Sequence, residues 1–259
     1  MKESQLKAIV QNFLKQGGLE AVPIPEGPTK TPDFEVLGDC EECLVELKTK
    51  EDDPRELEKD RGILAAGGFL TKSRPIAYGN SLANKIEEGC RQFAEYDGAN
   101  AKLHILWLHC VGIDAQLLYE NSLTTLFGTA IVVSEQLPTA IECYYFGHSA
   151  FIRYKDMLDA AIVSHDSNTP GYLELQFCVN CASDKISRLR ATRLYKYLAK
   201  YMYDPDEQER KGAAFIADVC CPRNTDDEVL SYLRQKYGLN HLQVLRFAQD
   251  KVAVATKTK

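Results

Sequence analysis

The segments TPDFEV (residues 31–36) and LVELKTK (residues 44–50) decide how this sequence folds. Both read as extended strands, and the polar stretch between them predicts a tight turn, so the two form a hairpin. Residues two apart on a strand point to the same side, so Glu46 and Lys48 share one face of the second strand. The apolar residues that alternate with them point the other way, towards a core.

Asp33 stands at the start of the first strand. Residues directly opposite each other in an antiparallel pair share a face, so Asp33 joins the face of the second strand's acid and lysine if the loop holds an even number of residues. A two-residue loop at 40–41 would pair Asp33 with Lys48. A loop at 39–40 would pair it with Glu46 instead.

Two carboxylates and one ammonium on one face have a definite chemistry. Carboxylate oxygens are hard ligands that suit Mg²⁺ or Mn²⁺. A bound divalent ion polarises a phosphoryl oxygen and generates hydroxide from water near neutral pH, while a lysine orients that water or neutralises charge on the phosphate. The same three side chains could instead simply line the solvent side of a hairpin.

Pro32-Asp33, the hairpin and Glu46-Leu47-Lys48 together resemble the signature of the PD-(D/E)XK nuclease superfamily, which has the restriction-endonuclease-like fold. The resemblance covers residues 1–112. It implies an αβββαβ core and metal-dependent cleavage of nucleic acid. On the matching positions it implies Asp33 and Glu46 as metal ligands and Lys48 as the catalytic lysine, and we expect the backbone carbonyl of Leu47 as a further ligand.

The predicted order of helices and strands around the hairpin also agrees with that core, and this agreement is independent of the motif. Apolar residues recur at helical spacing from residue 6 to residue 14, and 20–24 reads as a short strand. After the hairpin, a second helix is predicted to begin at Asn80 or Ser81 and to run to Tyr96. Residues 103–111 form an apolar run that predicts a buried strand.

The second helix carries a further candidate. Gln92 and Tyr96 lie in a narrow arc of the helix, beside its apolar stripe. The pentapeptide 92–96 resembles the glutamine–hydrophobic–x–x–tyrosine motif of one exonuclease branch of the superfamily. Gln92 would then support Lys48 or contact a phosphate; the alternative is an ordinary polar flank of an amphipathic helix.

The second half of the chain matches no pattern of that family. Residues 129–134 and 140–146 read as strands that could extend the core sheet. The loop-forming run HDSNTPG, which starts at His165, marks a boundary. We therefore divide the chain into a nuclease-like core, residues 1–165, and an α/β extension, residues 171–259, which is either a second lobe or more of the same domain.

Charge is unevenly distributed along the chain. The net charge is −6, whereas nucleic-acid-binding domains are often basic. One predicted helix, however, carries a basic stripe within about 140° of arc, which suits a phosphate backbone or is simply a solvated face. The stripe consists of Lys185, Arg188, Arg193, Lys196 and Lys200.

Composition sets further bounds. A chain of 259 residues with 45% hydrophobic content can bury a sizeable core. It has neither a signal-peptide pattern nor an apolar run of about 18 residues, which predicts a cytoplasmic protein without a membrane span. The nine cysteines include two C-x-x-C pairs, at 40–43 and 178–181, which are either a zinc site or buried free thiols.

The sequence therefore predicts a Mg²⁺- or Mn²⁺-dependent nuclease of the PD-(D/E)XK type that hydrolyses phosphodiester bonds in DNA. The alternative is a non-catalytic binding or scaffold module of the same fold in a defence or repair complex. Its acidic balance and long second half would then serve a protein partner or a second copy of the chain.

Overall fold

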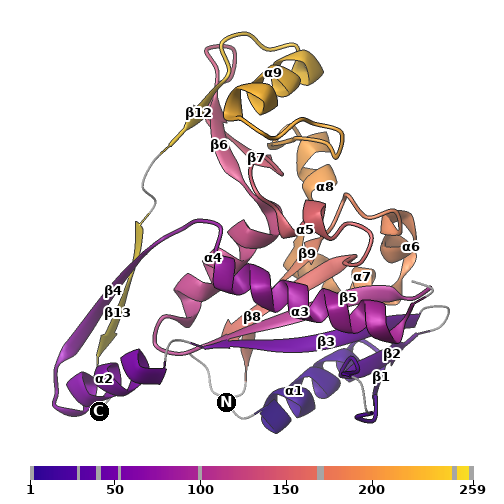
Figure 1. The fold of residues 1–259 in the computed structure, drawn as a ribbon, viewed down its shortest axis with the longest axis vertical. Coiled ribbons are helices and arrows are strands. Elements are labelled where there is room, and N and C mark those ends of the chain that lie inside the picture. The colour runs from indigo at the N-terminus through magenta and orange to yellow at the C-terminus, as the bar shows by residue number, and fades with distance from the viewer. Residues whose placement is uncertain are drawn as a thin grey trace.

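The computed structural model describes residues 3–27, 30–38, 42–51, 54–98, 101–167, 172–246 and 250–256. The chain is an α/β protein whose mixed central sheet is flanked by helices (Figure 1). The fold class expected from the sequence is confirmed at that level. Among the described residues, no helix combines the length and the hydrophobicity needed to cross a membrane.

The central sheet has seven strands in the order β1-β2-β3-β5-β8-β9-β10. The first three strands are antiparallel, β3, β5 and β8 run parallel, β9 turns back against β8, and β10 is parallel to β9. The strands are β1 (Glu20–Pro23), β2 (Phe34–Leu37), β3 (Glu42–Glu51), β5 (Leu103–Val111), β8 (Ala160–Asp166), β9 (Leu173–Val179) and β10 (Met202–Tyr203).

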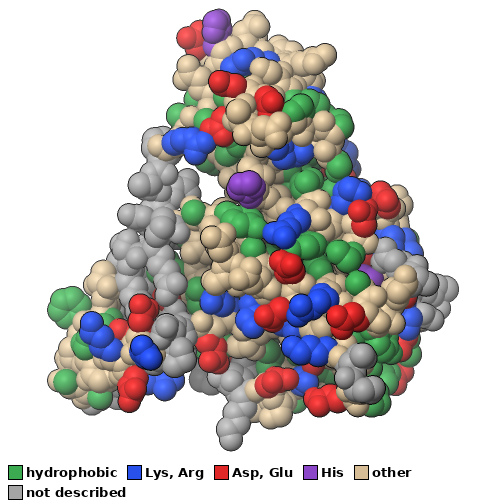
Figure 2. All heavy atoms as spheres, in the orientation of Figure 1, with side chains coloured by type: hydrophobic (Ala, Val, Ile, Leu, Met, Phe, Trp, Pro, Cys, Tyr) green, Lys and Arg blue, Asp and Glu red, His purple; other side chains and the backbone are tan. Residues whose placement is uncertain are grey.

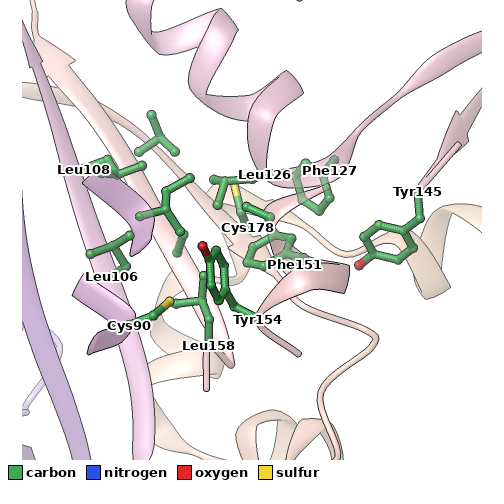
Figure 3. Packing of buried hydrophobic residues seen from close by; sticks show 14 of the residues in the cluster. Cys90, Leu106, Leu108, Leu126, Phe127, Tyr145, Phe151, Tyr154, Leu158 and Cys178 are labelled. Atoms are coloured by element: carbon green, nitrogen blue, oxygen red, sulfur yellow. The ribbon is translucent and has the colours of Figure 1, made fainter. Parts of the chain in front are cut away.

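Helices cover both faces of this sheet, and each face has its own hydrophobic cluster. On one face α3 (Asn80–Tyr96) and α4 (Ala115–Phe127) pack against Leu106 and Leu108 of β5 (Figure 3). On the other face α1 (Glu3–Gln16) packs against Trp107. The short helices α6 (Ile186–Ala191) and α7 (Arg193–Leu198) share that second face, followed by the 3₁₀ turn η1 (Ala199–Tyr201).

The strand β5 shows why the sheet is central. Eight of its nine residues, Leu103 to Cys110, are buried, as expected for a strand with parallel neighbours and helices on both faces. Beside it, β3 alternates: Val45 and Leu47 enter the cluster under α1, whereas Glu46 and Lys48 face the α3 side. The alternation predicted from the sequence is therefore confirmed.

A second sheet forms the upper lobe in Figure 1, with strand order β11-β7-β6-β12. Its two middle strands are the segments that we expected to extend the central sheet, and that expectation is wrong because they pair with strands from the end of the chain. This sheet packs against α9 through its own cluster, with Leu233 at its centre. Its elements are β6 (Ala130–Val133), β7 (Ile141–Tyr144), α8 (Pro205–Arg210), β11 (Ala214–Ile216), α9 (Asp226–Tyr237) and β12 (Gln243–Leu245). The short helix α5 (Ala150–Arg153) follows β7 and packs instead in the cluster of α3 and α4.

An insertion separates β3 from α3. Helix α2 (Pro54–Ala65) leads into β4 (Phe69–Pro75), which pairs along its whole length with β13 (Asp250–Thr256) to form a two-stranded ribbon at the left of Figure 1. The expected element order, with α3 directly after the hairpin, holds only if this insertion is set aside.

The predicted division of the chain falls between β8 and β9. These strands are hydrogen-bonded neighbours in the central sheet, so the start of the range 171–259 completes the sheet of the range 1–165. Strands β9 and β10 fit the alternative in which the extension is more of the same domain. The four-stranded sheet fits the alternative in which the extension is a second lobe.

Candidate active site

The start of β2 places Asp33 beside β3. The ladder between the two strands ends at Phe34 opposite Val45, so the same register carried one residue further puts Asp33 opposite Glu46. This is the pairing expected for a loop at 39–40, although the loop itself lies outside the described residues. The Asp33 carbonyl accepts the Ile24 N–H at 3.0 Å, which ties this point of the chain to the segment after β1.

The two oxygens of the Asp33 carboxylate have different partners. Oδ2 accepts the backbone N–H of Leu47 at 2.8 Å, and Oδ1 lies 2.6 Å from Nζ of Lys7. A strand residue directs its N–H and C=O to the same neighbour in an antiparallel pair. The Leu47 carbonyl therefore faces the same side as its N–H, towards Asp33.

Lys48 links the strand to helix α3. Its Nζ lies 2.6 Å from Glu46 Oε1 and also donates a hydrogen bond to Gln92 Oε1. The Gln92 amide then donates to the carbonyl of Thr31 at 3.3 Å. The structure thus gathers Asp33, Glu46, Lys48 and Gln92 in one cluster, and Gln92 joins α3 to the segment before Asp33.

A glycine lets α3 come close enough for this contact. A Cβ on Gly89 would lie 2.6 Å from Cδ1 of the buried Leu106 and 3.7 Å from Cγ of Glu46. Because Gly89 has no side chain, the helix approaches β3 and β5 directly. One turn further along, Gln92 then reaches Lys48.

Glu46 is the most perturbed group of the cluster. Its side chain is 3% exposed, and burial together with the neighbouring Asp33 charge raises its pKa to about 7, although the ion pair with Lys48 acts in the opposite direction. Its second oxygen, Oε2, is buried without a hydrogen-bond donor among the described residues. Two ionised carboxylates cannot hydrogen-bond to each other directly, so a shared proton, a cation or a bridging water is needed to join Glu46 to Asp33.

The donor set fits a hard divalent cation. The Asp33 carboxylate, the Glu46 Oε2 atom and the Leu47 carbonyl are oxygen ligands of the kind that Mg²⁺ and Mn²⁺ prefer. The unsatisfied Oε2 supports this fit, because a cation would supply the partner that the protein does not. The lysines paired with the two carboxylates, Lys7 on Asp33 and Lys48 on Glu46, oppose it.

A second group of potential ligands lies elsewhere. Cys181, Asp204 and Asp206 bring ligand atoms within 4.8 Å of one another. Arg190 donates to both carboxylates of this group, at 2.8 Å to Asp204 Oδ1 and 2.7 Å to Asp206 Oδ2. Asp204 also accepts the Tyr195 hydroxyl and caps α8.

Burial alone would raise the pKa of Asp204, but the hydrogen bonds from Arg190 and Tyr195 outweigh it and lower the pKa. A guanidinium thus already supplies the positive charge that this group needs. We read it as the structural anchor between α6 and α8.

The predicted basic stripe lies on the opposite face of the central sheet from α3, and its helix is interrupted. Thr192 ends α6 and caps α7, so residues 185–200 do not form the single helix that we expected. Lys185 donates to the Lys102 carbonyl at 2.5 Å and also meets Asp159, and Arg188 donates to the Ala101 carbonyl.

The remaining three stripe residues differ from one another. The guanidinium of Arg193 covers Gly18, where an added Cβ would lie 2.3 Å from Nη2. Lys200 lies 4.6 Å from the ring centroid of Tyr201, and Lys196 is exposed. Lys185 and Arg188 therefore tie the chain together, and Arg193 packs over Gly18, just after α1. Of the five residues only Lys185 is half-buried; Arg188, Arg193, Lys196 and Lys200 are exposed.

The two C-x-x-C pairs do not combine into one site. Cys43 lies in the cluster under α1 and Cys178 in the cluster under α3, on opposite faces of the sheet. Cys40 lies outside the described residues.

Sequence reasoning missed Lys7. The apolar spacing of the first helix contained one weak signal, because Lys7 lies only about 20° from Leu14 in helical projection. A lysine so close to the apolar stripe of a packed helix needs a partner for its ammonium. The sequence does not show that this partner is Asp33.

A cleft lies between the upper lobe, the segment just before α3 and the end of α4. Its volume is about 840 Å³, and its lining includes Tyr78, which precedes α3, together with His148 and Arg153. The Tyr78 and His148 rings are 5.7 Å apart, and Arg153 reaches Glu87 of α3 at 3.6 Å. Across the front of the molecule, acidic and basic side chains alternate rather than forming one basic field (Figure 2).

Comparison with known proteins adds no identification. No protein-family model matches this chain, and no curated protein or solved structure matches it either.

Proposed function

We propose that the chain is a divalent-metal-dependent phosphodiesterase of the PD-(D/E)XK type, with DNA as its substrate. The observation that carries the proposal is the buried Glu46 oxygen that lacks a donor, beside the Asp33 carboxylate and with Lys48 on the same face. A structural hairpin has no need for a buried carboxylate beside a second, largely shielded one, because bringing them together costs free energy. Functional sites are where such perturbed groups gather.

Each residue of the cluster has a role in this proposal. Asp33 and Glu46 would hold Mg²⁺ or Mn²⁺ with the Leu47 carbonyl, and the ion would polarise the phosphate and acidify an attacking water. Lys48, held between Glu46 and Gln92, would orient that water or donate to a phosphate oxygen. Gln92 would fix the position of the lysine, because its own amide is tied to the Thr31 carbonyl.

Further positive charge lies beside the cluster. The pKa of Glu88 on α3 is lowered, first by its hydrogen bond from Lys85 at 3.1 Å and also by the charges of Lys48 and Lys30. Lys85 therefore pairs directly with Glu88 on α3, and the charges of Lys48 and Lys30 also act on this half-buried position. A phosphate backbone that approaches α3 would meet this field despite the acidic net charge.

The experiment uses the full-length chain with a panel of single- and double-stranded DNA and RNA, in Mg²⁺, Mn²⁺ or EDTA. We expect DNA cleavage with either ion and none in EDTA. Asp33→Ala and Lys48→Ala should abolish cleavage while the far-UV circular dichroism stays native. Lys50→Ala, on the same strand and the same face, is the matched control and should cleave normally. Undiminished cleavage by both folded site variants would refute the proposal.

A different surface could also contact the substrate. If the basic stripe binds DNA, the double variant Lys196→Glu, Lys200→Glu should bind DNA more weakly. The slope of log K against log salt concentration should also become shallower by about one for each lysine that contacts a phosphate. An unchanged salt slope would remove the stripe from the binding surface. The cluster around Glu46 would remain unaffected by that result.

One observation favours a second candidate function, the non-catalytic module. Each carboxylate of the cluster already has a lysine, Lys7 on Asp33 and Lys48 on Glu46, so the arrangement carries equal numbers of positive and negative groups without an ion. A module of this kind should show no Mn²⁺-dependent rise in melting temperature. A clear Mn²⁺ shift that disappears in Asp33→Ala would eliminate it.

A further inference from the structure

The first helix contributes a cation to the candidate metal site. Nζ of Lys7 lies 2.6 Å from Asp33 Oδ1 and 3.0 Å from Oε1 of Glu3, four residues earlier on the same helix. The Asp33 side chain is 13% exposed and that of Glu3 is 74% exposed. Lys7 therefore bridges a shielded acid of the site and a solvent-exposed acid outside it.

The two lysines of the cluster are held differently. Lys48 is two residues from Glu46 on a central strand and is also bound to Gln92, so its ammonium has two partners inside the site. Within the described part of the chain, Lys7 has Asp33 as its partner inside the site, and its side chain is 34% exposed. If Lys7 leaves Asp33, its ammonium keeps the ion pair with Glu3 and becomes more hydrated, so its charge is not left unpaired in a buried position.

A divalent cation would compete with Lys7. The outward oxygen of Asp33 is occupied by the ammonium, and the other oxygen already accepts the Leu47 N–H. Like charges a few ångströms apart repel strongly in a shielded site. An ion that uses Asp33 together with Glu46 must therefore weaken or displace the Lys7 contact.

Resting on the proposed function, we propose that Lys7 is an internal counter-ion of the metal site: it neutralises Asp33 in the metal-free protein, and it releases Asp33 and keeps only Glu3 when a divalent cation binds. The lysine keeps two carboxylates close together without an ion. It also lowers the affinity of the site for a metal ion, because metal binding must break the charge-assisted hydrogen bond between Lys7 and Asp33.

The opposing explanation is that Lys7 is a structural clip that orients Asp33 for the ion. The two explanations predict opposite changes in metal affinity when Lys7 is removed. Removing a competitor tightens metal binding, whereas removing a clip loosens it.

The test is isothermal titration of the metal-free, full-length chain with MnCl₂ at pH 8. We expect Lys7→Gln to bind Mn²⁺ about tenfold tighter than the wild type, the factor that corresponds to one hydrogen bond to a charged group. Lys15→Gln, near the other end of α1, is the matched control and should bind like the wild type. Equal or weaker binding by Lys7→Gln, with the wild type binding normally, would overturn the counter-ion role and leave the proposed function intact.

A second variant covers the case in which Lys7→Gln fails to fold. Lys7→Arg keeps the positive charge and offers a fixed fork of donors to the carboxylate, so it should bind Mn²⁺ more weakly than the wild type. Tighter binding by Lys7→Arg would contradict the counter-ion role. If no variant and no wild-type protein binds Mn²⁺, the proposed metal site fails together with this inference.

Discussion

Replacing Glu46 by glutamine should stabilise the metal-free protein in alkaline solution but hardly at all in acid. Glutamine has the shape of a protonated glutamate and cannot ionise. The pKa of Glu46 is raised to about 7 in the folded protein, first by burial and then by the Asp33 charge, and it returns to about 4.5 when the chain unfolds. The difference corresponds to about 3 kcal/mol.

The direction in which stability changes with pH depends on which state, folded or unfolded, binds the Glu46 proton more tightly. Below pH 4.5 Glu46 is protonated in both states and has no effect on the free energy of unfolding. Between pH 4.5 and 7 the unfolded chain releases the proton while the folded protein keeps it, so stability falls as the pH rises. Above pH 7 the folded protein carries the full cost of the buried charge, and the glutamine variant does not.

The assay is urea unfolding in EDTA at pH 5 and pH 8.5, followed by the fluorescence of Trp107, which is buried and is the only tryptophan of the chain. We expect Glu46→Gln to exceed the wild type by less than about 1 kcal/mol at pH 5 and by about 3 kcal/mol at pH 8.5. Glu20→Gln, at an exposed position, is the control and should show the same small difference at both pH values. A Glu46→Gln difference that does not change with pH would refute the electrostatic account of this site.

Three further predictions concern the same residues and the second acidic group. Gln92→Ala removes a partner of Lys48 and should slow single-turnover cleavage about tenfold or more without changing Mn²⁺ affinity; an unchanged rate would exclude a positioning role. Mn²⁺ must displace the Glu46 proton, so its affinity should fall by up to about tenfold for each pH unit below 7, and equal affinities at pH 6 and pH 8 by calorimetry would contradict this. Asp204→Ala removes the buried carboxylate that pairs with Arg190, accepts the Tyr195 hydroxyl and caps α8, and should lower the free energy of unfolding by about 3 kcal/mol while Mn²⁺ binding persists; loss of Mn²⁺ binding would show that this group is the metal site instead.

The parts of the fold that the sequence predicted are those with local signals. The helical spacing in α1 and α3, the alternation in β3 and the continuous apolar run of β5 each follow from residues close together in the chain. The hairpin register that places Asp33 opposite Glu46 was one of two alternatives, and only the ladder between β2 and β3 distinguished them.

The parts that were missed depend on distant partners. Strand β4 pairs with β13 at the other end of the chain, so nothing near β4 in the sequence predicts its partner. Strands β6 and β7 join β11 and β12 for the same reason. The interruption at Thr192 arises because its hydroxyl caps the next helix, which spacing of basic residues does not indicate.

The residues of the candidate site also fall into two groups, those that local sequence patterns predict and those that depend on distant contacts. The Glu46 and Lys48 pair follows from strand periodicity, and the position of Gln92 follows from helix periodicity. The contact between Lys7 and Asp33 does not, because it joins a helix on one face of the sheet to the residue just before β2, far along the chain. The raised pKa of Glu46 likewise depends on burial, which local sequence patterns do not measure.

Anomalous diffraction from crystals of the full-length protein soaked in MnCl₂ tests the central claim most directly. We predict a manganese peak between the carboxylates of Asp33 and Glu46, with Glu46 Oε2 and the Leu47 carbonyl as ligands. A peak at Cys181, Asp204 and Asp206 alone, or no peak beside Glu46, would contradict the account.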